Sequence, residues 1–290
     1  MRISERWRRR VGNRLTEVTS RSGFLAIGRD FRTYWEFGQG EPVVLVPGLA
    51  GGVALVAQLA RFLGDHYRVL CLEPCDEGAA FLYSPPRSLD DLAREQQLFI
   101  EALGLERATV VGVSFGATVA LRLALRAPAR VHTLIVSGAG THSSTLTATV
   151  LQELLDRYQF SAESTIVNRF FESLFGGQEQ PGELLRFVTR RCWDTGQATI
   201  AHRLGLLSQF DVRRDVGRIQ APALVIAGRD DRIVRWEAQL ALAEALPKGR
   251  FVAIDGAGHL CFVTRPRRFA SLVHRFLQET ANDTELGQEP

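Results

Sequence analysis

The sequence of 290 residues has few cysteines, a single lysine and no long apolar run. A membrane-spanning helix needs about 18 or more consecutive apolar residues, so the missing run excludes that class of protein. The four cysteines are widely spaced, with no CxxC pair and no Cys/His cluster, which excludes a disulfide scaffold and a structural zinc site. With 46% hydrophobic and 23% charged residues, the composition is typical of a globular protein with a sizeable core.

The basic residues are almost all arginines, because Lys248 is the only lysine among 35 basic residues. The net charge of +3 is small, and we expect no nucleic-acid partner. Part of this charge lies in the N-terminal arm, residues 1–23, which we expect to be solvated and loosely held. A membrane-surface or nucleic-acid contact, or a transit peptide, is the alternative interpretation of this arm. No signal-peptide type of apolar stretch follows it, so we expect a cytoplasmic protein without stable membrane insertion.

Short apolar, β-branched runs alternate with longer amphipathic stretches along most of the chain. This alternation is typical of an α/β protein with a mostly parallel sheet and crossover helices. The predicted strands are 24–27, 32–37, 43–46, 68–72, 109–113, 133–136, 223–227 and 250–254. The first two are expected to form an antiparallel hairpin at the sheet edge. The predicted helices are 54–63, 89–103, 117–127, 236–246 and 266–278, and Ser88 with Asp91 predicts a capping box.

The alternation breaks once, over residues 141–215, where helical patterns occur without strand-like runs. Predicted helices there are 147–158, 164–175, 183–193 and 199–209. A helical stretch of this length cannot lie within the sheet, so it is expected to form a cap over one sheet edge. The domain organisation we predict is a core of residues 24–140 and 216–279, a helical cap of 141–215, and a polar, disordered tail of 280–290.

The pentapeptide Gly112-Val-Ser-Phe-Gly116 has the pattern GxSxG. Alone this pattern is a weak signal, but here it follows a buried strand and precedes a helix, so Ser114 falls at a sharp strand-to-helix turn. Such a turn strains the backbone of Ser114 and requires small residues two positions before and after it, and both are glycine. The helix N-terminus also directs free N–H groups to the point where an oxyanion would form.

A serine hydroxyl needs a base to become a nucleophile, and a histidine base needs a carboxylate to fix its tautomer. Of the six histidines, His259 follows the strand 250–254 and would lie at the C-terminal edge of the sheet. Asp230 and Asp231 follow the strand 223–227, and at most one of the two is expected to face His259. The chain order Ser, Asp, His is the order expected of one fold in particular.

On these motifs the sequence resembles the α/β-hydrolase superfamily from about residue 24 to about residue 278. The resemblance implies an eight-stranded, mostly parallel sheet with a helical lid inserted after the sixth strand. Its Gly-x-x-Asp-x-x-Val pattern assigns the acid to Asp231, with Asp230 as the minority option. The loop 46–52 resembles the family's oxyanion loop, so the backbone N–H groups of Leu49 and Phe115 would form the oxyanion hole. Two departures are Pro47-Gly48 in place of His-Gly, and the segment 73–80 in place of the usual Asp-x-x-Gly-x-Gly-x-Ser stretch.

The motifs predict a serine hydrolase that cleaves a carboxylic ester, or a related acyl bond, of a small apolar substrate without metal or cofactor. One alternative is hydrolysis of a carbon–carbon bond in a diketone-type ring-cleavage product. Another is a hydrolase-fold small-molecule receptor with slow turnover. The aromatic residues of the cap either line an apolar pocket or pack a core, with packing favoured: Phe170, Phe171, Phe175, Phe187, Trp193 and Phe210. His142, His202, Arg190 and Arg191 are minor candidates for substrate contact.

Overall fold

The computed structural model describes residues 20–28, 30–74, 87–143, 145–177, 180 and 182–286. The predictions made for the first 19 residues of the basic arm, and for most of the departing segment 73–80, lie outside these described residues.

The described strands form one eight-stranded sheet with the order β1-β2-β4-β3-β5-β6-β7-β8. Strand β2 pairs antiparallel with β1 and with β4, and every other pair is parallel. The strands are β1 (Ser20–Ile27), β2 (Asp30–Phe37), β3 (Pro42–Val46), β4 (Arg68–Leu72), β5 (Ala108–Val113), β6 (Val131–Ser137), β7 (Ala223–Gly228) and β8 (Gly249–Ile254). The predicted α/β fold class and the antiparallel hairpin at the sheet edge are both confirmed.

The hairpin begins earlier than the sequence indicated. Strand β1 starts at Ser20 and pairs along its full length with β2, from Ser20 opposite Phe37 to Ile27 opposite Asp30. Residues 20–23 therefore belong to the sheet and not to the N-terminal arm. The sequence did not predict a strand at these residues, because two are serines and one is a glycine, whereas strands are recognised by β-branched and aromatic residues.

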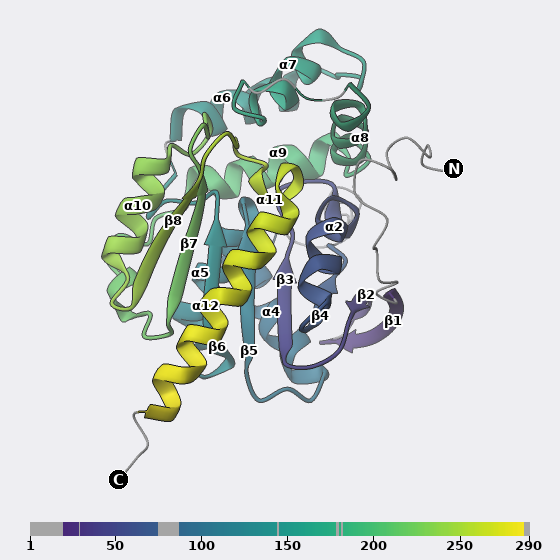
Figure 1. Ribbon diagram of the computed structural model, residues 1–290. Coiled ribbons are helices and arrows are strands. Elements are labelled where there is room, and N and C mark those ends of the chain that lie inside the picture. The colour runs from purple at the N-terminus through teal and green to yellow at the C-terminus, as the bar shows by residue number, and fades with distance from the viewer. Residues whose placement is uncertain are drawn as a thin grey trace.

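Helices cover both faces of the sheet (Figure 1). They are α2 (Gly52–Gly64), α4 (Leu89–Ala102), α5 (Phe115–Arg126), α10 (Trp236–Ala245), α11 (Cys261–Thr264) and α12 (Pro266–Leu286), with short 3-10 turns at Pro128–Arg130 and Val216–Arg218. The predicted capping box at the start of α4 is present, since Ser88 and Asp91 each accept the other's backbone N–H. These accepted bonds hold the pKa of Asp91 below its usual value.

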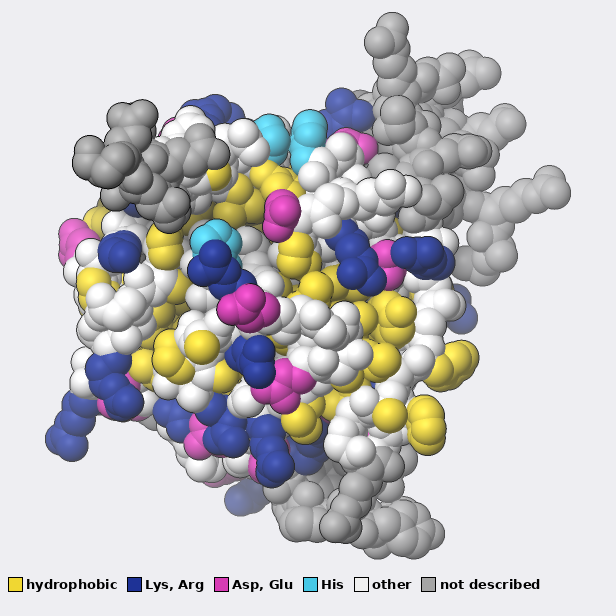
Figure 2. All heavy atoms as spheres, turned by 90° about the horizontal axis from the view of Figure 1, so that it is seen from below, with side chains coloured by type: hydrophobic (Ala, Val, Ile, Leu, Met, Phe, Trp, Pro, Cys, Tyr) yellow, Lys and Arg dark blue, Asp and Glu magenta, His cyan; other side chains and the backbone are white. Residues whose placement is uncertain are grey.

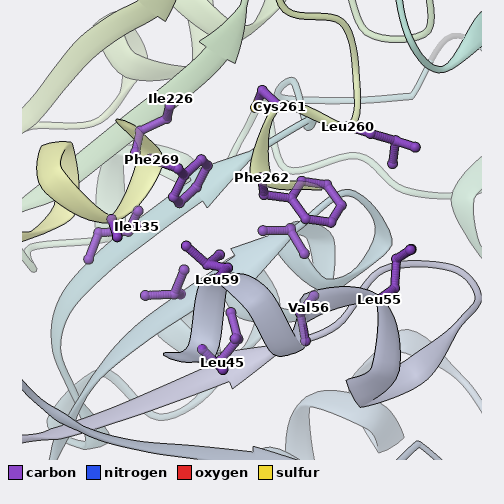
Figure 3. Packing of buried hydrophobic residues seen from close by; sticks show 14 of the residues in the cluster. Leu45, Leu55, Val56, Leu59, Ile135, Ile226, Leu260, Cys261, Phe262 and Phe269 are labelled. Carbon is purple, nitrogen blue, oxygen red and sulfur yellow. The ribbon is translucent and has the colours of Figure 1, made fainter. Parts of the chain in front are cut away.

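Two hydrophobic cores lie on opposite faces of the sheet, because successive side chains of a strand alternate between its faces. In β3, Val43 and Leu45 belong to the core under α2, α11 and α12, while Val44 and Val46 belong to the core under α4, α5 and α10. Figure 3 shows Leu59 of α2 close to Phe262 and Phe269, which come from α11 and α12. Burying a side chain of this size contributes about 1.5–3 kcal/mol, so the packing fixes both layers firmly on the sheet.

Four further helices stand between β6 and β7 in the chain and are called the inserted helices: α6 (Thr145–Arg157), α7 (Thr165–Ser173), α8 (Gly182–Trp193) and α9 (Gln197–Ser208). All four occur where the periodicity predicted helices. Figure 1 shows them together at one end of the molecule, beyond the ends of the strands. They contact the core through hydrogen bonds from Gly51 N to Thr195 Oγ1 and from Leu260 N to Leu174 O.

The opposite end of the molecule carries charges of both signs. Figure 2 shows Lys and Arg side chains interspersed with Asp and Glu side chains on this face. Ion pairs between surface side chains of opposite sign occur in the described chain, such as Arg218 with Asp215 and Arg250 with Glu279. The face that is seen from this side thus has no continuous field of one sign.

The last helix corrects the prediction of a disordered tail from residue 280. Helix α12 continues to Leu286, and Thr280 Oγ1 donates to Phe276 O within it. The polar segment after Gln278 contains neither proline nor glycine until Gly287, so nothing in the chain stops the helix there.

Candidate active site

Ser114 occupies the turn between β5 and α5, where the sequence placed it. Its backbone has φ 54° and ψ −124°, and it is the only non-glycine among the described residues with positive φ. A residue with a Cβ is strained in this conformation, so the surrounding structure has to hold it. Its N–H donates to Ser137 O at 2.7 Å and its carbonyl accepts from Ala117 N at 2.8 Å.

The two glycines of the GxSxG motif are required by close backbone contacts. A Cβ on Gly112 would lie 2.5 Å from Gly116 O, and a Cβ on Gly116 would lie 2.2 Å from the carbonyl oxygens of Val46 and Pro47. These distances are far below any ordinary carbon–oxygen contact, and the obstructing atoms belong to the backbone. The sharp turn at Ser114 therefore exists only with glycine at both positions.

His259 is held in the loop between β8 and α11, close to Ser114. Its Nε2 lies 2.8 Å from Ser114 Oγ, and its Nδ1 lies 2.9 Å from Asp231 Oδ2. The imidazole and the carboxylate are both buried. The three side chains therefore form an unbroken chain of two hydrogen bonds, although they come from three distant loops.

Of the two adjacent acids, Asp231 is the one that contacts His259. Its Oδ1 accepts from the backbone N–H groups of Ile233 at 2.8 Å and Val234 at 2.9 Å. Asp230 instead donates its backbone N–H to Ala257 O at 2.9 Å, which ties the acid loop to the loop before His259. The motif spacing that favoured Asp231 agrees with this geometry.

The loop after β3 lies directly against Ser114. A Cβ on Gly48 would lie 3.4 Å from Ser114 Cβ and 3.9 Å from Ser114 Oγ, so the loop passes within contact distance of the hydroxyl. Phe115 is the first residue of α5, and the N–H groups of a first helical turn have no partner within the helix. The peptide that follows Leu49 in this loop is held by α9, because Arg203 Nη1 donates to Leu49 O at 2.6 Å.

Two titratable groups near this edge, the buried Cys261 thiol and the half-buried Glu73 carboxyl, have raised pKa values. Burial raises the pKa of the Cys261 thiol to about 12, so this thiol is neutral at physiological pH. Burial also raises the pKa of Glu73, which accepts from Trp35 Nε1 at 3.2 Å. Among the described residues, no group of three or more His, Cys, Asp and Glu side chains could hold a metal ion.

The minor candidates from the sequence are exposed or bonded to other groups, and Arg190 and Arg191 are both exposed. His202 Nε2 lies 2.8 Å from Arg87 O, His142 is exposed, and Arg191 pairs with Asp194. Among the cap aromatics, Phe171, Phe175 and Phe210 are buried in the cores, Phe170 and Trp193 pack against one of them, and Phe187 is exposed.

Sequence reasoning missed two residues of this site, Gln239 and Gly138. Gln239 donates to Asp231 Oδ2, and a Cβ on Gly138 would lie 2.8 Å from His259 Cε1. Gln239 lies within the predicted helix 236–246, and Gly138 follows the predicted strand 133–136. The sequence carried no signal for either contact.

The fold and the buried Ser–His–Asp chain define an α/β-hydrolase type of protein. A family model described as the alpha/beta hydrolase fold matches residues 41–266, so the chain belongs to this family. None of the described helices has both the length and the apolar character to cross a bilayer.

The relatives that this chain is similar to include proteins named as a hydrolase and as an esterase. A protein of Cronobacter turicensis named "Putative carbamate hydrolase RutD" is 29% identical over 243 residues, 81% of this chain and 90% of its own. A pimeloyl-(acyl-carrier protein) methyl ester esterase of Nitrosomonas europaea is 28% identical over 250 residues, 81% of this chain and 94% of its own. The solved structure of an enol-lactonase from Burkholderia xenovorans superposes with a TM-score of 0.79 at 21% identity, over 88% of this chain and all of that one; this similarity concerns the fold.

Proposed function

We propose that the protein is a serine hydrolase that cleaves a carboxylic ester, or a related acyl bond, of a small and largely apolar substrate. The observation that carries the proposal is the buried chain from Ser114 Oγ through His259 to Asp231, with steps of 2.8 and 2.9 Å. A hydroxyl next to an imidazole that is oriented by a carboxylate is the arrangement that activates serine as a nucleophile.

In this mechanism His259 Nε2 takes the Ser114 proton while Ser114 Oγ attacks the substrate carbonyl. The backbone N–H groups of Leu49 and Phe115 stabilise the oxyanion of the tetrahedral intermediate. His259 then gives its proton to the leaving alcohol, and the acyl group stays on Ser114. A water molecule that loses a proton to His259 hydrolyses this acyl-enzyme and restores the serine.

Asp231 accepts a hydrogen bond from the Nδ1–H of His259, and this fixes the tautomer that leaves Nε2 free to act as the base. The carboxylate also stabilises the imidazolium that forms during each half of the reaction. Because Ile233 and Val234 both donate to its other oxygen, the carboxylate cannot rotate away from the ring.

The inserted helices are proposed to form the cap that covers the site and shapes the substrate pocket. They stand at the end of the molecule where the strand-end loops carry Ser114, Asp231 and His259 (Figure 1), and Arg203 of α9 donates to Leu49 in the oxyanion loop. The relatives named for carbamate and methyl ester hydrolysis support a substrate with an ester or related acyl bond.

A p-nitrophenyl ester series of increasing acyl length, a p-nitrophenyl carbamate and a vinylogous 1,5-diketone test the proposal. We expect turnover of esters, and we expect Ser114→Ala to lower kcat/KM by several orders of magnitude without unfolding the protein. Ser271→Ala is the matched control, since this exposed hydroxyl donates only to Arg267 O of its own helix.

Each outcome separates the candidate functions. Turnover of the diketone alone would replace the ester hydrolase with a carbon–carbon bond hydrolase, and a single slow turnover would indicate a receptor. If Ser114→Ala hydrolyses esters at the full rate, Ser114 is not the nucleophile.

A further inference from the structure

Gln239 is a fully buried amide at the centre of the site. It lies on α10 and has no solvent exposure. Its Nε2 donates to Asp231 Oδ2 at 3.1 Å and to Val234 O at 2.8 Å, and its Oε1 accepts from Gly138 N at 2.8 Å. Both N–H groups and the carbonyl of the amide are thus used, so its orientation is fixed.

The peptide unit that Gln239 binds also holds the nucleophile. The N–H of Gly138 donates to Gln239 Oε1, and the carbonyl at the other side of the same peptide, Ser137 O, accepts from Ser114 N at 2.7 Å. Asp231 is therefore linked to Ser114 by two routes: through His259 on one side, and through Gln239 and the peptide of residues 137 and 138 on the other. Together they form a closed ring of hydrogen bonds.

Gly138 also fixes the imidazole by contact. It has φ 75°, and a Cβ there would lie 2.8 Å from His259 Cε1 and 3.3 Å from Ser114 Cα. The backbone of Gly138 therefore packs against the ring edge of His259 and against the backbone of Ser114. Any shift of this peptide would move the surface on which the imidazole rests.

We propose that Gln239 is a positioning residue, which holds Asp231 and the peptide of Gly138 so that Ser114 and His259 keep their reactive geometry. This inference rests on the proposed serine-hydrolase function. Ser114 needs such support, because its positive φ is strained and its N–H has to stay bonded to Ser137 O. The closed ring of hydrogen bonds supports the backbone of Ser114 and also fixes the carboxylate of Asp231. Hydrogen bonds that are linked in this way strengthen one another in a buried site.

Replacing Gln239 with leucine tests the positioning role by opening the ring. Gly138 N–H then has no partner in a buried site, and Asp231 loses one of its donors. For hydrolysis of p-nitrophenyl butyrate, kcat should fall about tenfold to hundredfold with little change in KM, because small misplacements of reacting groups have effects of this size.

Gln239→Glu is a second variant with the same shape. It is read out by the pH dependence of kcat/KM, which a purely structural role of Gln239 would not change. Its carboxylate can still accept from Gly138 N, but its second oxygen faces Asp231 without a proton to share. The added negative charge favours the charged imidazolium, so the acidic limb of the kcat/KM profile should move to higher pH by about one unit.

The other titratable groups near this site, Glu73 among them, are the same in the parent protein and in Gln239→Glu, so the difference between the two limbs reports the change at residue 239. Asp231, Ser114 and His259 belong to the relay itself. The buried Cys261 thiol, which lies 3.4 Å from Ser137 Oγ, has its pKa raised to about 12 and is uncharged over the pH range of the limb.

Gln197→Leu is the matched control. This amide also makes three hydrogen bonds, from its Nε2 to Leu155 O and Tyr158 O and from Phe160 N to its Oε1, but all of them stay within the inserted helices. Its loss should lower the melting temperature and leave the acidic limb where it is in the unsubstituted protein.

The outcomes separate the two proposals. If Gln239→Leu keeps the full kcat, or Gln239→Glu keeps the original limb while the parent protein hydrolyses the ester through Ser114, only the positioning role is wrong. If the parent protein does not hydrolyse esters, or Ser114→Ala hydrolyses them equally well, both proposals fail.

Discussion

The loops at the carboxyl ends of the core strands are packed more tightly than the inserted helices. In the loops at the carboxyl ends of the strands, Ser114, His259 and Asp231 are joined by hydrogen bonds. In the same region, a Cβ on Gly116 would lie 2.2 Å from backbone oxygens. In the inserted helices, a Cβ on Gly205 would meet only the flexible end of Gln152 at 3.0 Å. Tyr158, directly after α6, is also exposed, and so are four large apolar side chains of these helices: Val150, Leu154, Ile166 and Phe187.

This difference indicates where chemistry and selectivity are located. Reacting groups need fixed geometry, and loops carried by a rigid sheet supply it. Helices that make looser contacts can change their side chains without disturbing that geometry. On the proposed function, we therefore expect the acyl-transfer chemistry in the loops at the carboxyl ends of the strands and the choice of substrate in the inserted helices.

The largest expected effect comes from Asp231→Asn. The amide would no longer hold the His259 tautomer in which Nε2 is the base, so kcat should fall by about three to four orders of magnitude. Asp230→Asn is the matched control one residue away. Asp230 is bonded to Ala257 O through its backbone N–H, so the kcat of this variant should stay within a few-fold of the parent value. Steady-state kinetics on p-nitrophenyl butyrate would decide, and equal losses in the two variants would contradict the assignment of the acid.

A pair of glycine substitutions probes the packing tolerance of the two regions directly. Gly116→Ala forces backbone of the oxyanion loop to move, so it should destabilise the protein by about 3 kcal/mol or more and abolish activity. Gly205→Ala displaces only the Gln152 side chain and gains helix propensity, so its effect on the free energy of unfolding should stay below about 1 kcal/mol. Denaturant unfolding measures both, and a Gly116→Ala protein that is as stable as Gly205→Ala would remove the contrast.

Phe171→Ala should separate stability from substrate choice. Phe171 is 4% exposed, in α7, and its truncation should lower the free energy of unfolding by about 3–5 kcal/mol. Because we propose that the inserted helices shape the pocket, the KM values of long-chain esters should change more than that of the acetate.

Phe276→Ala in α12 is the control for this prediction. Phe276 is equally buried and lies under Arg250, away from the inserted helices. It should cost similar stability with no change in chain-length preference, and identical chain-length profiles for both variants would place substrate choice outside the inserted helices.

The smallest expected effect concerns Glu73, whose pKa is raised by burial. A carboxyl with a raised folded pKa is a cost to stability above that pKa and costs nothing where both folded and unfolded states are protonated. Glu73→Gln should therefore raise the melting temperature slightly at pH 8, and the gain should shrink as the pH falls from the raised folded pKa toward the ordinary pKa of glutamate and vanish below it. A gain that grows toward acidic pH would contradict the sign.

Much of this molecule could be predicted from the sequence because its signals are local. The strand before Ser114, the glycines on either side of it and the spacing around Asp231 are all read from short segments. The mostly parallel direction of the strands and the antiparallel hairpin at the sheet edge also followed, because alternating strands and helices allow few topologies. The hairpin start at Ser20 and the end of α12 at Leu286 were missed, since serine, glycine and polar residues carry weak propensity signals.

The bond network behind the site could not be predicted in the same way. Gln239 and Gly138 are 101 residues apart, and a helical pattern says that Gln239 is on a helix without saying what its amide meets. Which loops approach each other is decided by tertiary packing, and no local pattern records it.

The most direct test of the account is to label the protein with a fluorophosphonate and map the adduct by mass spectrometry. The reagent reacts with a serine that an adjacent base has activated, so we predict one adduct, on Ser114, and no adduct in His259→Ala. An unlabelled protein, an adduct on another serine, or equal labelling of Ser114 without His259 would contradict the account.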